Sequence, residues 1–216
     1  MSKKLSITIP KYSLSEELFN SISHGIGGGL GIAALVVMII KAKGALANTT
    51  VSLFGATIIL LYSMSCVYHG LSKNLEGKKV LRVLDHCNVF MLVLGTYIPA
   101  SLIGVGGTLG WVLFGMVTFF TILGIVFTAI WIDKFQVVPV ICHLFSGWSI
   151  LFGISKLLAN TGTKGVLYMI LGGIMYTIGA ALYGMGKKVK YMHCVFHIFC
   201  LLGTFFHFWA IYMYMI

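Results

Sequence analysis

The sequence predicts an all-α, polytopic membrane protein that folds as a bundle of seven transmembrane helices. Of the 216 residues, 59% are hydrophobic and only 9% are charged, whereas about a quarter of the residues of a soluble domain are charged. Apolar runs long enough to cross a bilayer, which takes about 20 residues, recur along the chain. The connections between them are short, so we expect residues 1–216 to form a single domain with a cytoplasmic segment at 1–17.

The apolar runs define the predicted spans in order. We expect helices over residues 18–41, 48–72, 80–104, 107–131, 137–158, 164–184 and 191–215. Pro99 lies inside the third span and is expected to kink it, because proline removes a helical hydrogen bond. Gly27 and Gly31 lie four residues apart in the first span, and glycines at this spacing let neighbouring helices approach closely.

The distribution of charge predicts the orientation of these spans. The chain holds 15 Lys and Arg against 5 Asp and Glu, but they lie in the connections rather than in one basic patch, so we expect no nucleic-acid partner. With a cytoplasmic N-terminus, eleven of the 15 fall on the inner side: Lys3, Lys4, Lys11, Lys73, Lys78, Lys79, Arg82, Lys134, Lys187, Lys188 and Lys190. The other four are Lys41, Lys43, Lys156 and Lys164. The positive-inside rule therefore places the N-terminus inside and the C-terminus outside.

Three histidines and an aspartate lie within or at the rim of these spans, where ionisable side chains are costly unless they have partners. His193 and His197 are four residues apart, so on a helix both imidazoles leave the same face. In the predicted topology His69 and Asp85 lie at the same membrane depth as this pair. Catalytic zinc takes three protein ligands, often imidazoles, and keeps one position open for water. We therefore predict a Zn²⁺ site with His69, His193 and His197 as ligands.

Polar and small residues repeat at helical spacing in three of the spans, which predicts faces that point into the bundle. These faces carry His193, His197, Cys200, Thr204 and His207 in the last span, Tyr62, Ser65, His69 and Ser72 in the second, and Glu17, Asn20, His24, Gly27 and Gly31 in the first.

The order of these motifs resembles that of the haemolysin III family, the bacterial branch of the progestin and adipoQ receptor (PAQR) superfamily. The resemblance runs from Glu17 to Trp209 and is carried by Glu17-x-x-Asn20-x-x-Ser23-His24, Ser65-x-x-x-His69, Leu84-Asp85, His193-x-x-x-His197 and His207-Phe208. The adiponectin receptors of this superfamily bind zinc through three histidines, which match the three predicted ligands. The resemblance also implies that Asp85 holds the metal's water, that Ser65 lies beside the site, and that the protein is a multi-pass protein of the bacterial cytoplasmic membrane.

The superfamily is also similar to alkaline ceramidases, which are membrane zinc amidases. We therefore expect a zinc-dependent hydrolase that acts on amide or ester bonds of membrane lipids and serves membrane lipid homeostasis. Asp85 would orient a water and take its proton, and Ser65 would donate to the developing oxyanion. Glu17, Asn20 and His24 would hold the first span against the helices that carry the ligands.

Other interpretations of the same residues remain open. His193 and His197 fit a packing pair, Asp85 fits an interfacial acid paired with Arg82, and Ser65 fits a hydroxyl that bonds its own backbone. His86 lies about 100° around the helix from Asp85 and is left out of the site. At the level of function, a receptor or regulator with a structural zinc is one alternative, and a pore-forming cytolysin, as the family name implies, is another. Membrane lipids are the expected partners, and the sequence names no oligomeric partner.

Overall fold

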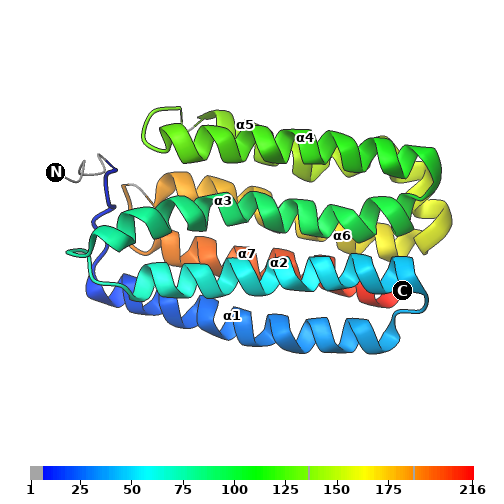
Figure 1. The fold of residues 1–216 in the computed structure, drawn as a ribbon, viewed down its shortest axis with the longest axis horizontal. Coiled ribbons are helices and arrows are strands. Elements are labelled where there is room, and N and C mark those ends of the chain that lie inside the picture. The colour runs from blue at the N-terminus through cyan, green and yellow to red at the C-terminus, as the bar shows by residue number, and fades with distance from the viewer. Residues whose placement is uncertain (1–6, 136, 187) are drawn as a thin grey trace.

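A computed structural model describes residues 7–135, 137–186 and 188–216, and within these ranges the chain is all-α, without a strand. The helices are α1 (Leu14–Lys41), α2 (Ala45–Gly70), α3 (Glu76–Pro99), α4 (Gly107–Trp131), α5 (Val137–Trp148), α6 (Ile154–Met185) and α7 (Met192–Tyr214). Figure 1 shows them side by side along one long direction. Residues 1–6 of the predicted cytoplasmic segment, which include Lys3 and Lys4, lie outside the described residues, as does Lys187.

Six helical runs among the described residues are long and apolar enough to cross a membrane, so the chain is a multi-pass membrane protein. Five match predicted spans in order: Leu14–Lys41, Ala45–Gly70, Glu76–Val105, Gly107–Trp131 and Met192–Tyr214. The sixth, Val137–Met185, is 49 residues long and contains both of the spans predicted at 137–158 and 164–184. The seven separate spans of the prediction are thus six in the structure.

The difference arises from the connection expected between those two spans. Helix continues through this region, and inside α6 only Gly162 departs from helical dihedral angles, with φ 69° and ψ 176°. A π-helical turn, η1 (Ala100–Val105), follows α3, and a 3₁₀ turn, η2 (Ser149–Gly153), joins α5 to α6. Pro99, where a kink was predicted, is the last residue of the regular α3 helix.

The polar faces predicted from spacing lie inside the bundle. All five residues of the face on α7 are buried, as are Tyr62, Ser65 and His69 on α2 and the five residues of the face on α1. Ser72 is the exception, because it follows the end of α2 and is exposed. The glycines of α1 bring its neighbours close: a Cβ atom on Gly27 would lie 2.6 Å from the Leu201 side chain, and one on Gly31 would lie 2.7 Å from Ile58.

Gly162 provides a test of the interruption inside α6. Its dihedral angles lie in a region that is essentially restricted to glycine, so Gly162→Ala should lower the free energy of unfolding by about 1–3 kcal/mol. A Cβ atom would meet nothing within 4 Å there, so the cost would come from the backbone alone. Gly115→Ala on α4 is the matched control, because its Cβ atom also meets nothing within 4 Å, and alanine should stabilise that helix slightly. Equal unfolding midpoints in detergent for the two variants would contradict the strained turn.

Candidate metal centre

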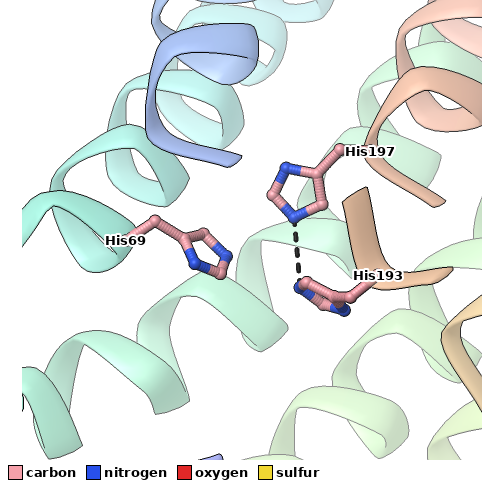
Figure 2. A group of neighbouring side chains, drawn as sticks. All are labelled: His69, His193 and His197. Atoms are coloured by element: carbon pink, nitrogen blue, oxygen red, sulfur yellow. Dashed lines mark hydrogen bonds between the residues drawn. The ribbon is translucent and has the colours of Figure 1, made fainter. Parts of the chain in front are cut away.

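The end of α2 and the beginning of α7 bring three histidines together. His69 lies in the last turn of α2, and His193 and His197 lie in the first two turns of α7. Figure 2 shows their rings facing one another across the gap between the two helices. All three are buried, and each offers a nitrogen that lies within 4.8 Å of the other two. The helical spacing of four residues therefore does place two imidazoles on one face, opposite the third.

The nitrogen atoms of this cluster are arranged as a ligand set requires. Nδ1 of His69 lies 2.7 Å from Oε2 of Glu17. A carboxylate only accepts hydrogen bonds, so this nitrogen carries the proton and Nε2 presents a lone pair. Nε2 of His69 is buried and has no hydrogen-bond partner among the described residues. Nε2 of His193 and Nε2 of His197 are 3.2 Å apart. A histidine whose second nitrogen is held by a carboxylate is the usual form of a metal-binding imidazole.

A buried lysine bonds the same Glu17 carboxylate that contacts His69. Nζ of Lys78 donates to Oε1 of Glu17 and to the backbone carbonyl of Leu71, each over 2.8 Å. Lys78 was predicted only as one of the charges of a cytoplasmic connection, yet it is fully buried, whereas Lys79 binds Glu76 near the surface over 3.1 Å. Nothing in the spacing of these two adjacent lysines distinguishes them. Their difference comes from the way α1 and α3 pack around the end of α2.

Aromatic rings stack against the two imidazoles of α7. His24 stacks on His197 with ring centroids 3.7 Å apart, and Tyr12 stacks on His193 with centroids 4.7 Å apart. His24 and Glu17, both proposed from the sequence as supporting residues, thus contact the cluster directly. Asn20, the third such residue, is fully buried, and its amide has no hydrogen-bond partner in the part of the chain that the structure describes.

The segment before α1 lies across the same end of the bundle. The Thr8 amide donates to Oδ2 of Asp133 over 2.8 Å, and Arg82 donates to the Thr8 carbonyl over 2.6 Å and to Oδ1 of Asp133 over 2.7 Å. Burial raises the pKa of Asp133, but the bonds from Thr8 and Arg82 outweigh it and hold that pKa below its ordinary value. Arg82, which the sequence offered as a partner for Asp85, therefore pairs with Asp133 instead. This anchoring keeps Tyr12 over His193.

A cavity of about 450 Å³ adjoins His193 and His197 and is lined mainly by α3, α5, α6 and α7, with Ser65 contributed by α2. Most of its lining is apolar, and its volume lies in the range of small-molecule sites. Asp85, Ser65, His193 and His197 all line it. His207 also lines it, ten residues after His197, which at 1.5 Å per residue places it about 15 Å farther along α7.

His86 shares this cavity, although its angular position on α3 argued for leaving it out of the site. Its Nδ1 lies 3.7 Å from Oδ2 of Asp85, and its Nε2 lies 3.1 Å from the hydroxyl of Tyr183. The cavity is wide enough to reach two adjacent faces of α3, so a difference of 100° does not separate these residues. Sequence reasoning left His86 out because it took an offset of about 100° around the helix to point this side chain away from the site.

Comparison with known proteins gives consistent matches over most of the chain. A family model described as "Haemolysin-III related" matches residues 12–208. The chain is 32% identical over 206 residues to Hemolysin-3 of Bacillus cereus, which covers 94% of this chain and 93% of that protein. It is 33% identical over 196 residues to the Hemolysin-3 homolog of Bacillus subtilis (strain 168), which covers 89% and 91%. A more distant match, 21% identical over 173 residues, is the monocyte to macrophage differentiation factor of Mus musculus, with 77% and 70% covered.

Proposed function

The chain belongs to the haemolysin III family, and from this premise we propose that it is an integral membrane zinc protein that hydrolyses an amide or ester bond of a membrane lipid. The observation that carries the proposal is the buried group of His69, His193 and His197, whose nitrogens converge within 4.8 Å.

Zinc fits the donor set that the cluster offers. Three imidazoles are the protein ligands of several catalytic zinc sites, which keep a fourth position for water or substrate. The lone pair on Nε2 of His69 is buried without a hydrogen-bond donor among the described residues, and a buried polar atom of this kind calls for a partner. Held by these histidines, zinc would supply a Lewis acid for a carbonyl oxygen and would lower the pKa of a bound water toward about 7.

Asp85 and Ser65 are the groups that act on the substrate. Both line the cavity that His193 and His197 also line. The Asp85 carboxylate orients the attacking water and accepts its proton. The Ser65 hydroxyl donates a hydrogen bond to the oxygen on which negative charge develops. The proton that Asp85 takes would then pass to the leaving amine or alcohol, which completes the hydrolysis.

A lipid is the substrate class that fits the cavity. Its mainly apolar lining extends about 15 Å beyond the histidines, which suits a hydrocarbon chain rather than a polar solute. Tyr12 lies over His193, and the segment that carries it is anchored at Thr8, so the end of the bundle near the histidines is covered. These features support entry of the substrate sideways from the bilayer. The proposed partner is therefore membrane lipid, and the proposed role is membrane lipid homeostasis.

The proposal includes a topology in which the chain crosses the membrane seven times with its N-terminus inside. The run Val137–Met185 of 49 residues would be about 74 Å long as a straight helix, more than twice the hydrocarbon thickness of about 30 Å. Gly162 interrupts it, and Figure 1 shows the chain turning back at the yellow segment. Two crossings by this run bring the total to seven. The bias of Lys and Arg then favours a cytoplasmic N-terminus, in the cytoplasmic membrane of a bacterium.

A structural zinc in a receptor or regulator is the second candidate, and the link that the histidines make between α2 and α7 favours it. A pore is less well supported, because a water-filled lumen needs a polar lining and the cavity is mainly apolar. The name Hemolysin-3 describes the relatives and is not evidence of a pore in this chain.

We expect the purified protein to hold about one zinc per chain, because three imidazoles and one open position complete its coordination. Replacing His69, His193 and His197 together with alanine should remove nearly all of it. His143→Ala is the matched control, since His143 lines the same cavity outside the cluster and should leave the zinc content unchanged. Elemental analysis makes the measurement. Equal zinc in the wild type and the triple variant would refute the assignment.

The orientation can be tested with topology reporters. An alkaline phosphatase fused after Ile216 should be active, because that end lies outside, whereas the same reporter fused after Lys134 should be inactive. A fluorescent protein that matures only in the cytoplasm should give the opposite pattern at the two positions. An active phosphatase at Lys134 together with an inactive one at Ile216 would reverse the proposed orientation.

Asp85→Asn separates catalysis from structure, because asparagine keeps the size of the side chain but cannot accept the proton. Turnover of N-acyl and ester lipids in nanodiscs should fall on the order of a hundredfold or more, with zinc content close to normal. Glu76→Gln, which changes an exposed acid outside the cavity, should keep most of the turnover. No turnover above a chelated control across the lipid panel would favour the regulator. Full turnover in Asp85→Asn would remove only the role given to Asp85.

A further inference from the structure

We propose that Lys78 is a positioning residue for the metal centre: it holds the carboxylate of Glu17 in the place from which that carboxylate orients His69. The inference rests on the proposed zinc site and adds to it a residue that contacts no ligand nitrogen. The chain of contacts runs from Nζ of Lys78 to Oε1 of Glu17 over 2.8 Å, and from Oε2 of Glu17 to Nδ1 of His69 over 2.7 Å.

The burial of Lys78 is the first step of the argument. Its side chain is fully buried, and an ammonium group is costly to take out of water unless its hydrogens are bonded. Glu17 and the Leu71 carbonyl take two of its three hydrogens, and the ammonium lies 5.1 Å from the centre of the Tyr68 ring. A buried ion pair is often no more stabilising than apolar residues of the same size. Stability alone therefore gives little reason for a charge at this position.

The second step concerns the two groups that Lys78 bonds and the helices that carry them. Glu17 lies in the first turn of α1, Lys78 lies in the first turn of α3, and Leu71 follows directly after α2. His69 lies two residues before Leu71. One ammonium group therefore fixes both the carboxylate that bonds His69 and the end of the helix that carries it. Loss of this group would leave Glu17 with a single partner and a choice of rotamers.

Two effects of Lys78 on a bound cation oppose each other. Its positive charge repels the cation, whereas its hold on Glu17 keeps the His69 lone pair directed at the site. The pair of Lys78 and Glu17 is neutral as a whole, so the repulsion is largely cancelled. Orientation is then the larger effect, and removing Lys78 should weaken metal binding rather than strengthen it. Groups that orient ligands in this way typically change metal affinity by about 10–100-fold.

Zinc affinity, measured by competition with a chelating dye on the full chain in nanodiscs, tests the inference. Lys78→Met should weaken binding about tenfold or more, and Lys78→Arg, which keeps the charge and the donors, should restore most of it. Lys79→Met is the matched control, because Lys79 is the next residue and its bond to Glu76 lies near the surface. The visible spectrum of the cobalt-loaded protein should change in Lys78→Met and stay unchanged in Lys79→Met.

A double-mutant cycle tests whether Lys78 acts through Glu17. In a Glu17→Gln background, Lys78→Met should cost little further affinity, because the carboxylate that Lys78 holds is already gone. An equal cost in both backgrounds, or unchanged or tighter binding in Lys78→Met alone, would overturn the inference. Lys78→Leu, which also removes the ammonium and its donors, replaces Lys78→Met if the latter does not fold, with the same outcomes. A wild-type protein without zinc would instead overturn the metal centre itself.

Discussion

The hydrogen bond between Glu17 and His69 is the contact on which the proposed centre depends. It joins α1 to α2. Because Nδ1 of His69 donates this hydrogen bond, Nε2 is left free to bind a cation. The remaining contacts at this end of the bundle support the same arrangement: Lys78 holds the carboxylate, and His24 and Tyr12 stack against the imidazoles of α7. A polar cluster buried in a membrane bundle is stable only when its members satisfy one another.

Much of this arrangement follows from helical spacing. The interval of four between His193 and His197, and the polar repeats on α1, α2 and α7, predict which side chains point inward, and those side chains are buried apart from Ser72. A face is predictable because the bilayer leaves only one place for polar groups, namely the bundle interior. The convergence of His69 with the pair on α7 also follows from span order and depth, since both helices meet at the same end of the molecule.

Other features depend on packing that spacing does not contain. Lys78 and Lys79 are chemically identical neighbours, and only the meeting of three helices buries the first. Gly162 interrupts the helical dihedral angles within α6, where a separate connection was expected. Arg82 binds Asp133 because the segment before α1 and the connection after α4 meet there, a contact between residues 51 positions apart. The burial of Lys78 and the pairing of Arg82 are tertiary contacts between segments distant in sequence, which periodicity cannot reveal.

X-ray absorption at the zinc edge tests the central claim most directly, because it reports the atoms bound to the metal rather than its presence. Coordination by His69, His193 and His197 predicts about three imidazole nitrogens near 2.0–2.1 Å with one further oxygen. The imidazole signal should disappear from protein in which these three residues are alanine. Sulfur at about 2.3 Å, supplied by a buried cysteine such as Cys194, or an unchanged spectrum in the triple variant, would contradict the account.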